Sequence, residues 1–495
     1  MLNLLIFLPF VAAILILLGS PARKTALIAA IGQFLVSAFA FLSYDRATAG
    51  FQFVHRNALV PAWDFNYFLA ADGLSVVMLL LTGLVTLAAI WVTPTVERRP
   101  GLFYACLLFI SAGCAGAFAS QDLFFFYAFH ELALIPTFLL IGIWGSGERH
   151  SNAWKVTIYL ALGSFVLLIG LVDLYTSLPA ELRTFDMVKL QQLGSQAIAT
   201  GAQVRPFLLL LIGFGILISL FPFHTWAPSA YASAPAPAAM LHAGVLKKFG
   251  LYGLFRLAVP LLPEGAKQPV LFGWSGIDIL LILLVGNIIY VGLATIAQRK
   301  LDLMLGYSSV MHMGYIFLGL AAMNVIGLSG AALLMFAHGL SIAALFAITG
   351  MIRERQTNLS FDSLGGVATS MPSLGVAFGM AAFASIGLPG FGNFSSEIMV
   401  FFGAFKNGPA SLQFSPMQIA TIFALWGVVI SAVYMLRAYR RVFLGEPQKP
   451  IAAWENPTRI ARWPVLLLLA VLMVAGFAPN YFLSFIRPTV EALLR

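Results

Sequence analysis

The segment 386–397 reads Ile-Gly-Leu-Pro-Gly-Phe-Gly-Asn-Phe-Ser-Ser-Glu and lies inside a long apolar run of the chain. Proline and glycine within such a run interrupt a membrane helix and free backbone amides and carbonyls. The segment ends on Glu397, and an ionisable group inside a membrane is costly and is usually retained for ion or proton movement. The segment therefore predicts a broken membrane helix with a functional carboxylate beside the break.

The composition of the whole chain is typical of a polytopic membrane protein. Of its 495 residues, 60% are hydrophobic and 9% are charged, and the mean hydropathy is +0.93. A soluble domain needs far more charge to cover its surface. The net charge of +9 comes from residues spread over many loops, so it does not indicate nucleic acid binding.

Apolar runs of roughly 20 residues, the length that crosses a bilayer core, recur about fourteen times along the chain. We therefore expect an all-α polytopic membrane protein with about 14 transmembrane helices. The lysines and arginines test this count, because sixteen lie in odd-numbered connections and nine in even-numbered connections and the C-terminal tail. By the positive-inside rule, the odd connections face the cytoplasm or its equivalent, and both termini lie on the opposite side.

A second apolar run is also interrupted. Residues 214–228 read Phe-Gly-Ile-Leu-Ile-Ser-Leu-Phe-Pro-Phe-His-Thr-Trp-Ala-Pro. Broken helices in both halves of a membrane protein are typical of inverted repeats around an ion path near the midplane. We expect a single membrane domain over 1–495, with leading helices to about 100, repeats over about 101–262 and about 275–442, each containing a broken helix, and a last helix over about 463–486.

Ionisable residues recur inside the apolar runs. Glu131 lies in Phe-His-Glu-Leu-Ala-Leu-Ile-Pro (129–136), close to a proline break at Pro136, and Lys247 and Lys248 share one apolar run. Histidines lie in the same runs at His224, His242, His312 and His338. Several histidines alternating with Glu and Lys fit a hydrated proton relay. Two other interpretations stay open: a protonated glutamate as a hydrogen-bonding contact between helices, and histidines as haem ligands.

Several segments together resemble one family. They are 71–75, 129–136, 139–144, 221–226, 307–315, 337–341 and 387–397. Through them the chain resembles the antiporter-like subunits of NADH–quinone oxidoreductase (respiratory complex I), a proton-conducting family that includes Mrp antiporter subunits. The resemblance covers nearly the whole chain, and Glu rather than Lys at 397 favours the M-type subunit over the L and N types.

The resemblance implies roles for individual residues. Glu131 matches the family's fifth-helix carboxylate, Lys248 its eighth-helix lysine, and Glu397 its twelfth-helix carboxylate at the exit. His312 and His338 match histidines on its central axis. The candidate site therefore comprises Glu131, Lys155, His224, Lys247, Lys248, His312, His338 and Glu397.

One position departs from the family in a way that affects the site. The seventh-helix lysine, which in the family forms an ion pair with the Glu131 equivalent, is Leu217 here. Because a lone carboxylate in a membrane tends to take up a proton, we expect a replacement cation within about 4–6 Å of Glu131. Lys155, Lys247 and a group of a partner chain are the candidates. The alternative is a protonated Glu131 and a lost coupling switch.

The function implied by the resemblance is proton translocation by a membrane-arm subunit that couples quinone reduction to proton transfer, in the bacterial cytoplasmic membrane. No cofactor is expected in this chain, whereas NADH, FMN, iron–sulfur clusters and quinone are expected in partner subunits. The expected partners are L-type and N-type antiporter-like neighbours and lipids, with no nucleic acid. The alternatives are a subunit of a multi-subunit Na+/H+ antiporter or membrane-bound hydrogenase, and a structural subunit with a degenerate proton channel.

Overall fold

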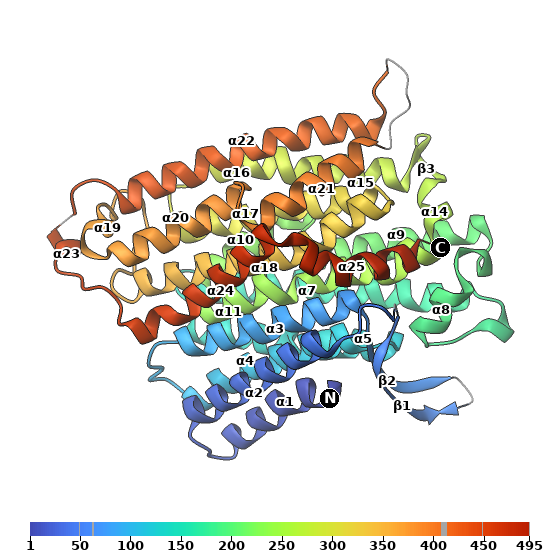
Figure 1. Ribbon diagram of the computed structural model, residues 1–495, viewed down its shortest axis with the longest axis horizontal. Coiled ribbons are helices and arrows are strands. Elements are labelled where there is room, and N and C mark those ends of the chain that lie inside the picture. The colour runs from blue at the N-terminus through green and yellow to red at the C-terminus, as the bar shows by residue number, and fades with distance from the viewer. Residues whose placement is uncertain (49, 62–63, 407–412, 448, 495) are drawn as a thin grey trace.

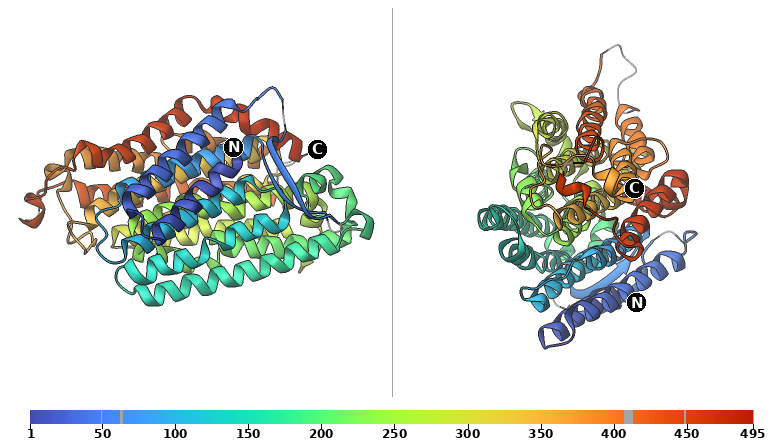
Figure 2. Two further views of the ribbon diagram at one scale, coloured as in Figure 1. Left: turned by 90° about the horizontal axis from the view of Figure 1, so that it is seen from below. Right: turned by 90° about the vertical axis from the view of Figure 1, so that its left-hand side faces the viewer.

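The computed structural model describes residues 1–48, 50–61, 64–406, 413–447 and 449–494 (Figure 1). Its helices run roughly parallel to the long axis of the molecule, and α1 and α22 lie on opposite sides of the bundle (Figures 1 and 2). The expected all-α class is confirmed. In the described residues, eleven helical segments are long and apolar enough to cross a membrane, so the count of fourteen and the inverted repeats stay predictions.

The segments that are long enough to span are built from the following helices: α2 (Ala22–Ser43), α3 (Gly73–Val92), α4 (Pro100–Ala119), α5 (Leu123–Glu131) with α6 (Leu134–Trp144), α7 (Arg149–Thr176), α9 (Thr200–Ile218) with α10 (Trp226–Ser233), α15 (Gly276–Val285) with α16 (Val291–Ala297), α17 (Leu301–Ala321), α18 (Val325–Arg353), α22 (Pro416–Phe443) and α24 (Arg459–Phe477).

Shorter helices complete the bundle and its ends: α1 (Leu2–Leu17), α8 (Met187–Leu193), α11 (Ala236–Leu241), α12 (Lys248–Gly253), α13 (Val259–Leu261), α14 (Pro263–Lys267), α19 (Val367–Ser370), α20 (Pro372–Ile386), α21 (Gly392–Lys406), α23 (Lys449–Ala452) and α25 (Pro479–Leu493). Between them lie π-helical turns at His242–Leu246, Leu254–Ala258 and Gly286–Tyr290. The strands are β1 (Gln52–Val60), β2 (Phe65–Ala71), β3 (Pro269–Leu271) and β4 (Trp274–Ser275).

The interior of the bundle is formed by α3 and α18. The apolar windows of both helices are entirely buried, whereas those of α2, α7, α22 and α24 are only 33% to 44% buried. The side chains that these outer helices expose include large apolar ones such as Phe39, Phe165 and Trp426. An apolar exterior around a buried centre is the arrangement that a hydrocarbon solvent requires. Any polar group attached to α18 is therefore far from the lipid-facing surface.

Both expected helix breaks are confirmed. In the first, α9 ends at Ile218, Ser219 adopts a left-handed conformation (φ 66°), and α10 begins at Trp226. In the second, α20 ends at Ile386, Gly387 is left-handed (φ 83°), and α21 begins at Gly392. Each break frees the last carbonyls of the helix before it for other donors.

The proline break expected close to Glu131 is also confirmed, and the structure divides the last helix. The helix of Glu131 ends at that residue and resumes at Leu134, because Pro136 has no amide hydrogen to donate to the Leu132 carbonyl. The expected last helix over about 463–486 is two helices, since α24 ends at Phe477 and α25 begins at Pro479.

The long connection before α3 forms an antiparallel hairpin of β1 and β2, which the sequence did not suggest. Asp64, between the two strands, accepts hydrogen bonds from Lys189 (2.7 Å) and Thr184 (2.6 Å). Partial burial acts to raise the pKa of Asp64, but the hydrogen bonds from Lys189, Thr184 and Asn66 outweigh it and lower the pKa to about 2. This carboxylate therefore ties the hairpin to the loop around α8, at one end of the bundle (Figure 1).

Candidate functional site: a buried row of charged and polar side chains

Lys248 lies at the centre of the site and is fully buried. It follows the π-helical turn His242–Leu246, in which the amide of Lys247 donates to the carbonyl of His242 at 3.0 Å. Lys248 Nζ donates to the Ala243 carbonyl oxygen at 2.7 Å, and it lies 3.0 Å from Nδ1 of His338 on α18. The widened turn therefore leaves a main-chain acceptor for the ammonium group of the following turn.

From His338 the row continues to the second helix break. The rings of His338 and His312 lie 5.5 Å apart between centroids. Nδ1 of His312 is 2.7 Å from the Ser308 carbonyl oxygen, and Nε2 is 2.7 Å from the carbonyl oxygen of Ser385, in the last turn of α20. A neutral imidazole has one N–H and can donate to only one of these carbonyls, so the ring gains a second donor bond when it takes up a proton. The break thus supplies an acceptor to the histidine.

Glu397 stands beyond this break on α21 and is buried. Its Oε1 atom has no hydrogen-bond partner among the described residues. A Cβ atom at Gly387 would lie 2.2 Å from Oε2, so only glycine fits against this carboxyl group, and its φ of 83° also favours glycine. The interpretation of Glu397 as a hydrogen-bonding contact between helices lacks such a bond at Oε1.

Glu131 stands at the opposite end of the row, and its surroundings differ. The hydroxyl of Ser164 on α7 donates to Oε1, and Nδ1 of His130 lies 3.6 Å from the same oxygen. The side chain of Glu131 is 33% exposed, whereas that of His130 is 3% exposed. Glu131 therefore faces partly outward from this chain.

The two lysines expected to replace the missing cation have other partners. Lys155 Nζ donates to the Thr225 carbonyl oxygen at 2.8 Å, within the first break. Lys247 Nζ lies 3.5 Å from the Ser309 carbonyl oxygen and 5.7 Å from the ring centre of Tyr231. Among the described residues, the basic group within 4 Å of the Glu131 carboxylate is His130.

The first helix break brings together Lys155 and His224. His224 is buried in the short turn Phe223–Thr225, and its Nδ1 atom has no hydrogen-bond partner in the described part of the chain. Asn287 stabilises this break from the π-helical turn Gly286–Tyr290, because its side chain accepts from the amide of Phe221 and donates to the carbonyl of Ser219. The two residues thus lie beside a backbone held open by a side-chain amide.

Sequence reasoning missed a buried ion pair near the same helix run. Asp72 caps α3, and Arg256 lies in the π-helical turn Leu254–Ala258. Two guanidinium nitrogens of Arg256 each lie 2.5 Å from a carboxylate oxygen of Asp72, and one also donates to the Ser75 hydroxyl at 2.9 Å. The signal that could have revealed it is one arginine inside an apolar run and one aspartate at the start of another.

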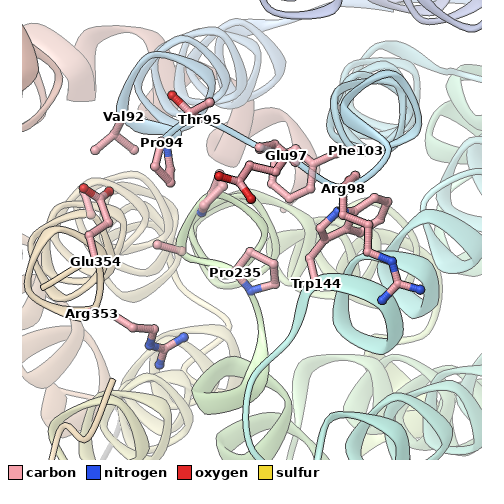
Figure 3. Close-up of a pocket in the computed structure, with 15 residues that line it drawn as sticks. Val92, Pro94, Thr95, Glu97, Arg98, Phe103, Trp144, Pro235, Arg353 and Glu354 are labelled. Carbon is pink, nitrogen blue, oxygen red and sulfur yellow. The ribbon is translucent and has the colours of Figure 1, made fainter. Parts of the chain in front are cut away.

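A cavity of about 380 Å³ lies at one end of the bundle, and none of the eight candidate residues lines it. Glu97 and Arg98, from the segment between α3 and α4, and Arg353 and Glu354, from the end of α18, line it together with Trp144 (Figure 3). A second cavity, of about 10 Å³, is lined by residues that include His242 and Tyr231. That volume is about what a single water molecule requires.

The described residues include no group of three or more His, Cys, Asp or Glu side chains that could hold a metal ion. What the row offers instead is a set of groups that take up and release protons, buried among broken helices. A helical bundle with these properties belongs to the class of proton-conducting membrane proteins.

Comparison with known proteins specifies the class. Residues 120–424 match the family described as NADH:quinone oxidoreductase/Mrp antiporter, transmembrane, and the chain belongs to this family. It is 35% identical over 465 residues to NAD(P)H-quinone oxidoreductase chain 4 of Gloeobacter violaceus (93% of this chain, 85% of that protein). It is 38% identical over 499 residues to NAD(P)H-quinone oxidoreductase chain 4 1 of Synechococcus elongatus (99% of this chain, 90% of that protein).

Solved structures agree with this assignment. A chain of respiratory complex I from Thermus thermophilus with bound NADH superposes with a TM-score of 0.89 and 28% identity, over 100% of this chain and 99% of that chain. A chain of the Mrp complex from Dietzia shares the fold, with a TM-score of 0.83 and 20% identity, over 100% of this chain and 99% of that chain. The chain is therefore a multi-pass membrane protein.

Proposed function

We propose that the chain is a proton-translocating, M-type membrane-arm subunit of a complex I-type NADH–quinone oxidoreductase. Its relatives are named as chain 4 of NAD(P)H-quinone oxidoreductases, and a similar chain stands in a respiratory complex I. NADH, FMN, iron–sulfur clusters and quinone would then be held by partner subunits. L-type and N-type subunits would flank this chain in the bacterial cytoplasmic membrane.

The observation that carries the proposal is the direct contact of Lys248 with His338 on α18, one of the two helices whose apolar windows are entirely buried. At 3.0 Å between Nζ and Nδ1, a proton can pass without an intermediate carrier. His312 extends the row by one ring, and it ends beside the second break. Such a series has little structural purpose, since buried charges without a charged partner are destabilising.

In this scheme the candidate residues take different parts. Lys248, His338 and His312 form the central relay, and Glu397 is the group through which protons leave it. Glu131 is the carboxylate whose charge state responds to neighbouring subunits. Lys155 and His224 serve the opening of the first break, and Lys247 supports the relay from the adjacent position.

The test of the proposal is Glu397→Gln in the assembled complex. The carboxamide keeps the shape of the side chain but cannot accept and release a proton, so we expect redox-driven proton uptake by membrane vesicles to fall by about 100-fold. The matched control is Glu264→Gln, since Glu264 is an exposed glutamate paired with Lys267.

Each outcome decides between specific alternatives. Loss of transport with normal assembly supports the proposal. Failure of the complex to assemble would indicate that Glu397 is a structural contact, and unchanged proton uptake would indicate a degenerate channel. Exchange of Na+ for H+ in the absence of any electron donor would favour the antiporter alternative.

A further inference from the structure

We infer that His130 is the charge partner of Glu131 in this chain, in the place where the family has its seventh-helix lysine. The inference rests on the proposed function, because a charge partner matters to Glu131 only if that carboxylate takes part in proton transfer. Its evidence is the distance between the two side chains at the end of α5, the packing of the imidazole ring and the contacts of the three lysines of the candidate site.

The two side chains meet at the end of α5. On a regular helix, successive residues point in directions about 100° apart and usually do not face each other. His130 and Glu131 are the last two residues of α5, and their side chains turn towards each other. Nδ1 of His130 lies 3.6 Å from Oε1 of Glu131. This distance is within ion-pair range but longer than a hydrogen bond, so a small side-chain rotation closes or opens the contact.

Packing fixes the orientation of the His130 ring. The ring stacks on Phe249, with 4.2 Å between centroids and 18° between planes, and Phe249 stacks in turn on Phe126 at 4.5 Å. Nδ1 has no hydrogen-bond partner in the described part of the chain, and the side chain is 97% buried, being 3% exposed. An imidazole nitrogen held in this way has the Glu131 carboxylate as its polar neighbour.

Phe249 also connects this pair to the central relay. It follows Lys248 directly on α12, so the stacked ring of His130 lies one residue away from the lysine that contacts His338. A change of charge at Glu131 and His130 is therefore felt at Lys248 through the low-dielectric interior rather than through solvent.

The three lysines of the candidate site are occupied elsewhere. Lys155 donates to the Thr225 carbonyl oxygen, Lys247 lies at the Ser309 carbonyl oxygen, and Lys248 contacts Ala243 and His338. Position 217 remains close to the carboxylate, because a Cβ atom at Gly163 would lie 3.1 Å from Leu217 Cδ2, and Gly163 precedes the Ser164 that binds Glu131. His130, at the end of α5, thus supplies the basic partner of Glu131 that a lysine at position 217 would supply from α9.

The chemical step is a single proton transfer. The O–H bond of the protonated Glu131 breaks, and an N–H bond forms at Nδ1 of His130, so that a neutral acid and a neutral imidazole become a carboxylate and an imidazolium. The net charge of the pair does not change. Only the second form places a positive charge on His130 and a negative charge on Glu131 near Lys248, which makes the pair a two-state element.

The experiment uses the assembled complex in membrane vesicles and measures redox-driven proton uptake. His130→Phe keeps an aromatic ring against Phe249 but removes Nδ1, and we expect proton uptake to fall by about tenfold. Adding Leu217→Lys to this variant returns a cation to Glu131 from the neighbouring helix, and we expect it to restore most of the lost rate. The matched control is His150→Phe, because His150 is exposed at the start of α7.

A second variant guards against misfolding. His130→Asn places an amide nitrogen near the position of Nδ1 and keeps a polar side chain, but it cannot take up a proton. Loss of transport in assembled His130→Asn complexes, with rescue of His130→Phe by Leu217→Lys, supports the inference.

Other outcomes would overturn it. If His130→Phe and His130→Asn transport at the normal rate while Glu131→Gln does not, the partner of Glu131 is a cation of another chain, and the proposed function stands. If both histidine variants lose transport and Leu217→Lys restores none of it, His130 has only a packing role. If Glu131→Gln and Glu397→Gln both transport normally, the proposed function itself is wrong.

Discussion

The helix run from α11 to α13 carries two groups of buried charge that differ in how the charge is balanced. Arg256 is paired through two nitrogens with Asp72, and both side chains are buried. About 12 Å further back along the same run, Lys248 faces a carbonyl oxygen and a histidine. A fully compensated pair holds helices together, whereas a cation with a titratable neutral neighbour can give up its proton. Burial alone therefore does not identify a functional charge, but the nature of its partner does.

The largest effect is expected from breaking the compensated pair. Arg256→Met leaves Asp72 buried without a countercharge, which costs about 3–5 kcal/mol in the free energy of unfolding. Asp72→Asn combined with Arg256→Met removes both charges and should recover most of that loss. Denaturation of the purified complex measures both effects. Equal losses in the single and double variants would show that the pair does not act as a clamp.

The control for this comparison is an exposed pair on α25. Arg487 and Glu491 form an ion pair at 2.8 Å with both side chains largely exposed. Arg487→Met should therefore cost no more than about 1 kcal/mol.

The next effect concerns the two adjacent lysines. Lys248→Met removes the ammonium group that contacts His338, and we expect proton uptake to fall by about 100-fold while the complex still assembles. Lys247→Met removes a contact to a carbonyl oxygen at 3.5 Å and should have a much smaller effect. Equal losses of transport would show that the relay does not depend on the Lys248–His338 contact.

A smaller effect is expected at the second break. Gly387→Ala introduces a Cβ atom 2.2 Å from the Glu397 carboxyl group and should lower proton uptake by about tenfold, since small displacements of reacting groups are costly. Gly390→Ala is the matched control, because Gly390 also has a positive φ (100°) but its Cβ would lie 3.4 Å from Phe477. If both variants lower proton uptake equally, backbone strain rather than contact with Glu397 is responsible for the loss.

The smallest effect is expected for the hairpin. The hydrogen bonds that lower the pKa of Asp64 to about 2 stabilise the folded hairpin only while the carboxylate is charged. Their contribution is therefore complete above the ordinary carboxyl pKa, and it is lost as the pH falls towards 2. Asp64→Asn should cost less than about 1 kcal/mol at neutral pH because this side chain is partly exposed. Between pH 5 and 8, the free energy of unfolding should depend on pH in the same way for the variant and the parent.

The features that the sequence predicted correctly are local ones. Pro222 and Pro389 lie at the two confirmed breaks because proline cannot continue the hydrogen-bond ladder, whatever surrounds it. The apolar composition predicted the helical membrane class because lipid tolerates only a backbone whose hydrogen bonds are made internally. Pro136 carries the same signal for the break after Glu131.

The features that the sequence could not predict depend on tertiary contacts. Nothing in the sequence near Lys155 says that its side chain reaches the Thr225 carbonyl, because that acceptor exists only where the first break exposes it. The pairing of Asp72 with Arg256 joins residues 184 positions apart. His130 was passed over because adjacent residues on a helix usually do not face each other, and the side-chain conformations that bring Nδ1 to 3.6 Å from Glu131 Oε1 became visible only in the structure.

The π-helical turn before Lys248 has a consequence for direction. The ammonium group donates to the carbonyl oxygen of Ala243 on its own helix and faces the ring nitrogen of His338 on another. An amide oxygen can accept a hydrogen bond but is far too weak a base to accept the proton itself, whereas an imidazole nitrogen can. Of these two neighbours, the carbonyl oxygen is a fixed anchor and the imidazole is the group that can accept the proton, so the widened turn holds the lysine in place and leaves its proton a route across to α18 rather than along its own helix.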